Sequence, residues 1–351
     1  MKRLICFFLL LIVSLLEAPC CLGVAPDRFN GFLVEFKLEN NLFPATISLD
    51  AFDEALADLG ELPAEAFYHK YISLSLPLWR GKNRVFGISY RQSARYQTTG
   101  ETLDYYRCLA EAADPQENKY YALQAAYFEY SQLGGYYAQK WVRDSFFMVL
   151  RGDLFLCYDF SKLDILGQGR IKYQFTGTKQ YELYANYQWD WLDPESPWGW
   201  GLNLDGNFNY SHSNLSLDLV LQNLLGSLYF KELRRDSGWV DTKEASIGLL
   251  PIMGFTREDS FYYRLPLSIT LQAAYTLEYG GVVAADLFAQ GENRDFVFSY
   301  RHPVGVINLL TSLHPDMKSV GFGMAGNYGE LIFIFGWNTP SLKGINLKLQ
   351  I

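Results

Sequence analysis

The chain has 351 residues, of which 17% are aromatic, and a formal net charge of −8. The acidic balance argues against nucleic acid as a partner. Beyond residue 23, no uncharged apolar run reaches the roughly 18 residues that a membrane helix needs. The mean hydropathy of −0.05 suits either a soluble β-rich protein or a transmembrane β-barrel, whose alternating strands keep average hydropathy near neutral.

Residues 1–23 have the pattern of a secretory signal. Lys2 and Arg3 precede an apolar run from Leu4 to Leu16 that only Ser14 interrupts. The run is short for a membrane helix, so a retained anchor is the less favoured alternative. We expect cleavage after Gly23 and an exported domain over residues 24–351.

Cysteine usage excludes a disulfide scaffold. Three of the five cysteines lie in the signal segment, which leaves Cys108 and Cys157. A single bridge between them stays open, but Cys157 lies within a strand pattern and is expected to be a small packing residue.

Segments with alternating apolar and polar residues run along most of the exported chain. About fourteen are credible strands, and several exceed the five or six residues usual in soluble sheets. A length near ten is what crossing a bilayer at a tilt requires. The prediction is an all-β fold, a transmembrane antiparallel β-barrel of about fourteen strands. The clearest segments are 31–39, 71–79, 119–133, 144–160, 181–191, 199–226, 261–275, 281–290, 294–301, 319–328, 330–337 and 344–351.

Two segments have helical periodicity instead. One lies near 48–60 with Ser48 as its cap, and the other near 102–113 with Thr102 as its cap. Both separate predicted strands, so each is expected in a loop. Such a helix could cap a rim, lie in the membrane interface or plug the lumen.

The stretch from Gly199 to Gly226 is the clearest hairpin. Apolar and aromatic residues alternate with amides and a carboxylate, and Ser211 to Asn214 are expected to turn the chain. A strand side chain changes face at every residue, so one face is apolar and the other polar. The apolar face has Trp200, Leu202, Leu204, Phe208 and Tyr210.

Polar residues within strand patterns are expected to face the lumen, because a charge aimed at lipid is unfavourable. They either form a structural inner network or line a solute path, and lumen width decides between these. The lumen-facing candidates are Asn203, Asp205, Asn207, Asn209, Asp218, Glu129 and Asp153.

Most tryptophans lie next to predicted turns. Aromatic rings at strand ends are typical of the girdles that mark the two membrane interfaces. Ordinary core tryptophan near a loop is the alternative reading. The interfacial candidates are Trp79, Trp189, Trp191, Trp198, Trp200 and Trp337.

The residues from about Lys119 to Ile351 resemble the FadL-like superfamily of outer-membrane barrels, closest to its PorV-type and TraF-like branch. The resemblance rests on the 199–226 hairpin, on Leu265–Tyr275, and on Gly321 and Gly323 in a terminal hairpin. Gln272 and Ala273 stand where that family usually has glycine. The resemblance implies an outer-membrane barrel and specifies architecture more than activity.

No catalytic residue, metal site or cofactor is predicted, because no phosphate loop, zinc spacing or convergent triad is recognisable. His212 and His314 are expected in turns. Three functions remain: an outer-membrane barrel that handles small or hydrophobic solutes, a non-transporting scaffold or secretion partner, and a soluble exported β-sandwich. The expected partners are membrane lipid, a solute and an envelope protein.

Overall fold

The computed structural model describes residues 33–40, 62, 65–109, 119–175, 179–193, 198–231, 233–241, 254–258, 260–290, 293–315, 317–326, 329–337 and 342–350. The predicted signal segment and the predicted helix near 48–60 lie outside these residues and stay predictions.

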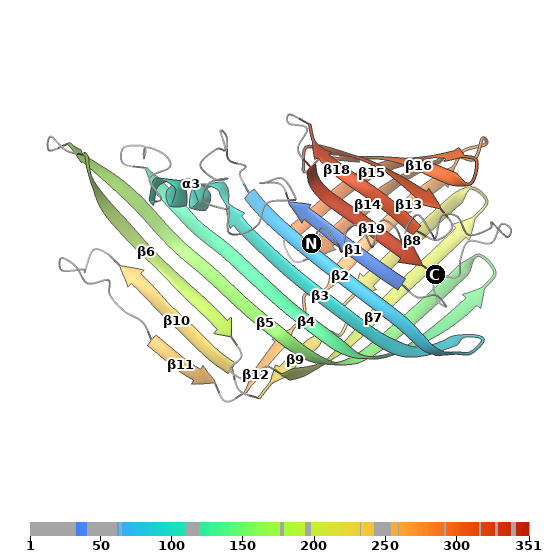
Figure 1. Ribbon diagram of the computed structural model, residues 1–351, viewed down its shortest axis with the longest axis horizontal. Coiled ribbons are helices and arrows are strands. Elements are labelled where there is room, and N and C mark those ends of the chain that lie inside the picture. The colour runs from blue at the N-terminus through green and yellow to red at the C-terminus, as the bar shows by residue number, and fades with distance from the viewer. Residues whose placement is uncertain are drawn as a thin grey trace, which may run out of the picture.

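One antiparallel sheet contains all the strands of the described chain (Figure 1). Its segments are β1 (Leu33–Asn40), β2 (Glu65–Arg80), β3 (Arg84–Thr99), β4 (Tyr120–Arg143), β5 (Phe146–Phe175), β6 (Lys179–Asp193), β7 (Gly199–His212), β8 (Leu215–Gln222), β9 (Ser227–Phe230), β10 (Leu233–Asp241), β11 (Gly254–Glu258), β12 (Phe261–Arg264), β13 (Ser268–Thr276), β14 (Val282–Gln290), β15 (Asn293–Val304), β16 (Ile307–His314), β17 (Ser319–Gly326), β18 (Gly329–Gly336) and β19 (Leu342–Gln350).

These nineteen segments form fourteen continuous strand lengths. β6 and β7 both pair with β5 and lie end to end along it. β8, β9 and β10 follow one another along β7 and β6. β13, β12 and β11 in turn pair with β8, β9 and β10. The prediction of about fourteen strands is confirmed.

The sheet closes on itself because β1 pairs with both β2 and β19. Closure leaves no open edge within the ring, which is the defining property of a barrel. The all-β, antiparallel barrel prediction is therefore confirmed, and the β-sandwich alternative is wrong.

The two ends of the barrel differ in their connections. At the end where β1 begins and β19 ends, six hairpins turn within two to five residues; they join β2 to β3, β4 to β5, β7 to β8, β13 to β14, β15 to β16 and β17 to β18. We call this the turn end. The opposite loop end has the long connections, including the 24 residues between Asn40 and Glu65.

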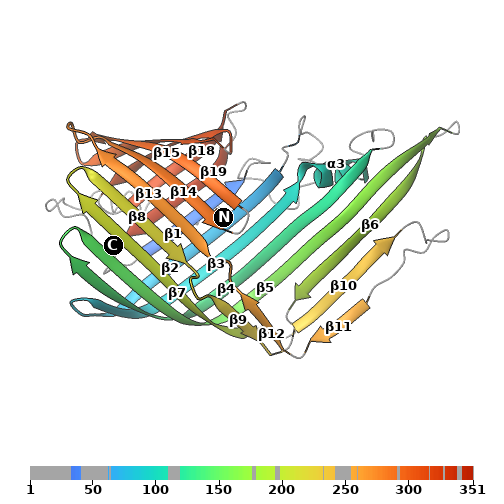
Figure 2. The same cartoon turned by 180° about the vertical axis from the view of Figure 1, so that it is seen from behind.

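Part of the wall continues beyond the barrel at the loop end. β6, β10, β11 and the second half of β5 form this extension, which rises obliquely away from the ring (Figures 1 and 2). The fourteen residues from Lys162 to Phe175 pair with β6 and at about 3.3 Å each cover about 45 Å along the strand. These strands exceed what a bilayer crossing requires.

A β-bulge lies where the extension leaves the barrel. Tyr130 of β4 faces two residues of β5, Asp159 and Phe160, and Asp159 adopts φ 53°. The bulge bends β5 and turns Phe160 inward onto an aromatic core. That core consists of Tyr130, Phe155, Cys157, Phe160, Leu192, Leu228, Phe230 and Leu265, with Phe128, Phe261 and Tyr263 packed against it.

The helix α3 (Gly100–Leu109) overlaps the second segment predicted to be helical, 102–113, and begins two residues before it. The side chain of Thr99, rather than Thr102, caps it, because its Oγ1 accepts a hydrogen bond from the Thr102 amide at 3.2 Å. Tyr105 packs on Tyr121 and Leu123 of β4. Odd-numbered Tyr121 lies on the face of β4 opposite to Phe128 and Tyr130, which belong to the inner core. α3 therefore covers the outer face, and a plug role for it is wrong.

Candidate functional site

The outer surface of the barrel is apolar. Along β7, Trp200 and Leu202 are about half exposed, while their neighbours Gly201 and Asn203 are buried. The same alternation recurs around the ring. Other exposed apolar residues on the wall include Leu76, Ile88, Leu133, Leu154, Leu156, Leu217, Ile269, Leu271, Val283, Leu287, Phe298, Leu309, Phe322 and Met324.

The inner surface contains a buried charge network centred on Asp153. The Asp153 side chain is 0% exposed and accepts hydrogen bonds from Arg151 (Nη2–Oδ1 2.7 Å) and Ser89 (2.9 Å). Arg91 lies 3.4 Å from Asp153 and 2.7 Å from Asp205. Asp205 also accepts bonds from the Asn203 amide and the Asn223 backbone N–H. Four charges of balanced sign thus lie on the inner wall.

The structure brings together most of the predicted lumen residues. Asn203, Asp205 and Asp153 belong to this network. Asn209 donates to Asp218 at 2.5 Å, one strand further along. Asn207 is on the same face of β7 and is half-buried.

Glu129 does not face the lumen. It alternates with Tyr130, which lies in the inner core, so its carboxylate is on the outer face, where Gln92 and Tyr127 donate to it. Its strand partner is Ser161, at the base of the extension. At that height the outer face lies beyond the apolar part of the wall, so a carboxylate does not meet that surface.

The two arginines that neutralise this network are not among the residues predicted from the sequence. Arg91 and Arg151 both lie within strand patterns, and Arg151 also stacks over the Tyr136 ring at 4.0 Å. A basic residue at an inward position of a strand was the available signal, but the lumen-facing candidates chosen from the sequence were all carboxylates and amides.

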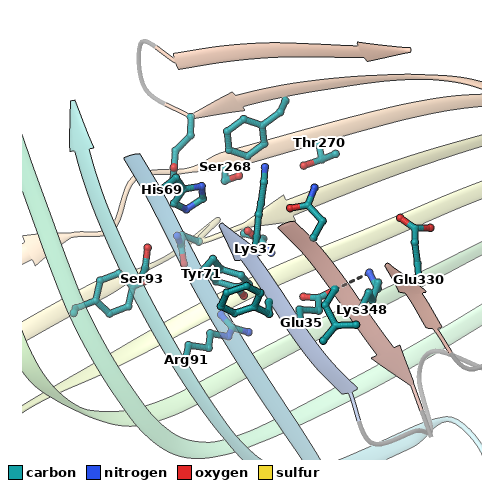
Figure 3. Close-up of a pocket in the computed structure, with 18 residues that line it drawn as sticks. Glu35, Lys37, His69, Tyr71, Arg91, Ser93, Ser268, Thr270, Glu330 and Lys348 are labelled. Atoms are coloured by element: carbon teal, nitrogen blue, oxygen red, sulfur yellow. Dashed lines mark ion pairs between the residues drawn. The ribbon is translucent and has the colours of Figure 1, made fainter. Parts of the chain in front are cut away.

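A cavity of about 270 Å³ lies inside the barrel beside the network. Its lining comes from both walls: β1, β2 and β3 on one side, β13 and β14 on the other, with β18 and β19 between them (Figure 3). The surface is polar and apolar in about equal parts and carries both charge signs. Among its lining residues are Glu35, Lys37, His69, Tyr71, Arg91, Ser93, Ser268, Thr270, Phe288, Gln290, Glu330 and Lys348.

Ion pairs hold some of these charges in place. Lys348 lies 2.6 Å from Glu35, as the dashed line in Figure 3 marks. Arg301 lies 3.1 Å from Glu330. The cavity therefore offers fixed charges, hydroxyls and amides in a confined space, which is a surface for a polar molecule rather than for a hydrocarbon chain.

The predicted interfacial tryptophans occupy different places. Trp79 is 54% exposed near the turn end, and Trp337 is 50% exposed at the loop end. Trp198 and Trp200 are similarly exposed where the extension begins. Trp191 belongs to the extension itself, where its indole N–H donates to Ser161. Trp189 lies in β6, and its side chain is outside the described set.

His314 ends strand β16 and does not lie in a turn, which corrects the prediction. Its Nε2 lies 2.9 Å from the hydroxyl of Ser312, and both residues are buried. Cys108 and Cys157 are free thiols, so the open bridge does not form. Among the described residues there is no cluster of metal-ligating side chains and no helix long and apolar enough to cross a membrane.

No family model matches the chain, and no curated protein matches it. Among solved structures, outer membrane phospholipase A from Escherichia coli aligns over 92% of this chain and 91% of that chain, with 12% identity and a TM-score of 0.27. The Salmonella typhi outer membrane phospholipase dimer aligns over 94% of this chain and 93% of that chain, with 11% identity and a TM-score of 0.25. The beta domain of the Bordetella autotransporter BrkA aligns over 91% of this chain and 98% of that chain, with 12% identity and a TM-score of 0.28. TM-scores this low establish no family.

The class of protein follows from the pairing of its own strands: a closed, antiparallel, fourteen-stranded β-barrel with an apolar exterior and an interior that holds both a charge network and an aromatic core.

Proposed function

We propose that the protein is an outer-membrane barrel through which small polar solutes pass. An apolar belt around a closed ring supports the membrane location, because an open edge or an exposed backbone in lipid would leave polar groups unpaired. β14 to β19 have 8 to 12 residues, which is close to the length needed to cross a bilayer at a tilt.

The connections suggest an orientation. Outer-membrane barrels have short periplasmic turns and longer extracellular loops. On that rule the turn end faces the periplasm, and the extension and α3 lie outside the cell. The FadL-like resemblance stays a prediction beside this proposal.

The main support for the passage of a polar solute is the cavity inside the barrel, which charged and hydroxyl side chains line. Charged and hydroxyl groups from opposite walls converge there, whereas the aromatic core that could suit a hydrophobic solute is closely packed and contains fully buried Phe160 and Phe230. A small polar solute is therefore favoured over a hydrophobic one.

Filling the cavity should block passage. Thr270 lines it from β13, so Thr270→Trp is expected to abolish the swelling of proteoliposomes in neutral sugars, where the wild type gives slow but measurable swelling. Sugars of increasing size report the width of the path.

Thr311→Trp is the matched control, since Thr311 is exposed on the outer wall of β16. It should swell like the wild type. Heat-dependent gel migration must show that both variants are folded barrels. Equal swelling by the folded Thr270→Trp variant would refute the cavity as the solute path.

The extension favours a second role as a scaffold for an envelope protein. Its last strand, β11, pairs only with β10 along the described chain, and such an edge can accept another strand. A photo-reactive residue at exposed Gln188 of β6 should then yield a discrete adduct in intact cells, with the same probe at Thr311 as the control. Equal labelling at both positions would contradict a docking role.

A further inference from the structure

Two side-chain contacts join walls of the barrel that are far apart around the ring. Counting the fourteen strand lengths from β1, β3 is third and β14 is ninth. β3 and β14 are therefore six positions apart in one direction, and β1 and β14 are six apart in the other. Seven positions would be diametrically opposite, so both contacts cross the lumen.

The first contact links Arg95 of β3 to Gln290 of β14. An Arg95 Nη1 hydrogen bonds to the Gln290 Oε1 at 2.8 Å, and the two residues are 195 positions apart in sequence. A guanidinium donor makes this hydrogen bond stronger than one between neutral groups. Gln290 is the last residue of β14, so the contact lies at the loop end of the short wall.

The second contact lies directly beside the first. Lys37 of β1 places its ammonium over the Phe288 ring, 5.2 Å from the ring centroid. Phe288 and Gln290 are two residues apart on β14 and therefore share its inner face. A cation over an aromatic face is held by the ring quadrupole.

Both contacts border the cavity. Lys37, Phe288 and Gln290 are among its lining residues, and in Figure 3 the Lys37 side chain points toward Ser268 and Thr270 of β13. From there the cavity extends toward the turn end, where Glu35 and Lys348 pair. The two contacts therefore border the cavity on its loop-end side, where a solute that enters from that end would reach them.

We infer that Arg95–Gln290 and Lys37–Phe288 form a latch that holds the lumen closed and opens transiently to admit solute. The inference rests on the proposed passage function and adds its regulation. Both halves are non-covalent contacts between side chains, so opening needs rotamer changes and no rearrangement of the sheet. Such motions are fast compared with domain movements.

Single-channel conductance in planar bilayers tests the latch. Arg95→Ala and Gln290→Ala should each raise the conductance or the open fraction several-fold over the wild type, and adding Phe288→Ala should raise it further. Gln290→Glu should act in the opposite direction, because a carboxylate bonds more strongly to the Arg95 guanidinium.

Arg84→Ala is the matched control. Arg84 lies on the same strand and also bonds a glutamine, Gln139 at 3.0 Å, but that glutamine is on the neighbouring strand β4 and the pair is exposed. Its conductance should equal that of the wild type.

The outcomes separate the latch from the passage function. A wild type as conductive as Arg95→Ala would overturn the latch and leave solute passage standing. A folded Arg95→Ala/Phe288→Ala variant that conducts no more than a protein-free bilayer would overturn the passage function. A rise in Arg84→Ala equal to that in Arg95→Ala would attribute the effect to lost positive charge and would also overturn the latch.

Discussion

Asp153→Asn will destabilise the folded barrel by about 3 kcal/mol, because it removes the buried charge that Arg91 and the half-buried Arg151 share. The carboxylate is 0% exposed and lies within 3.4 Å of both guanidinium groups. The asparagine side chain has the same shape as aspartate but no charge. Of the contacts described for it, Arg151 then keeps only those with the Ser75 hydroxyl and the Tyr136 ring. Denaturant unfolding of the protein in liposomes, followed by tryptophan fluorescence, measures the loss.

An aspartate-to-asparagine substitution in the extension gives the comparison for this loss of stability. Asp190 and Arg235 form a two-bonded pair at 2.8 and 3.1 Å, but their side chains are 29% and 40% exposed. Asp190→Asn should cost about 1 kcal/mol or less, as exposed ion pairs do. Similar losses in both variants would contradict a buried inner network.

Leu271→Arg is expected to destabilise the barrel in a bilayer by about 2–4 kcal/mol, the cost of an arginine at the membrane midplane. Leu271 is 43% exposed, and its strand partners are Leu219 and Leu287. It lies five residues from Thr276, the turn end of β13. At about 3.3 Å per residue and a tilt near 45°, this is about 12 Å into an apolar band about 25 Å tall.

Val306→Arg tests whether depth, and not the arginine itself, causes the loss. Val306 is 69% exposed in the two-residue turn between β15 and β16. There the cost should fall to about 0–1 kcal/mol. Unfolding in liposomes should therefore separate the two variants clearly, and equal small effects would count against a membrane belt.

The ring could be predicted because alternation determines which face of a strand is apolar. The hairpin from Gly199 shows this, since Trp200 and Leu202 face outward and Asn203 and Asp205 face inward. The turn is shorter than expected: Ser213 and Asn214 alone join β7 to β8. Ser213 adopts φ 51°, and positive φ is typical of tight hairpin turns.

Other features could not be read from local pattern. Glu129 faces outward because it alternates with inward Tyr130, but what an outward carboxylate meets depends on its height above the apolar belt, which the extension sets. The partners of Asp153 and Gln290 come from strands 62 and 195 residues away in sequence. Alternation predicts that a side chain faces inward, but which opposite side chain it meets depends on the register of all the strands between them around the ring.

The pairing of β1 with β19 has a consequence for how the molecule must form. Leu33 pairs with Gln350, so one edge of β1 has no backbone hydrogen-bond partner until β19, the last described strand, is in place. Until then β1 and β18 both present unpaired backbone groups, which attract other chains. Contacts this distant in sequence form slowly. The chain therefore needs protection until the ring closes, and loss of the final strand would leave an aggregation-prone sheet rather than a smaller barrel.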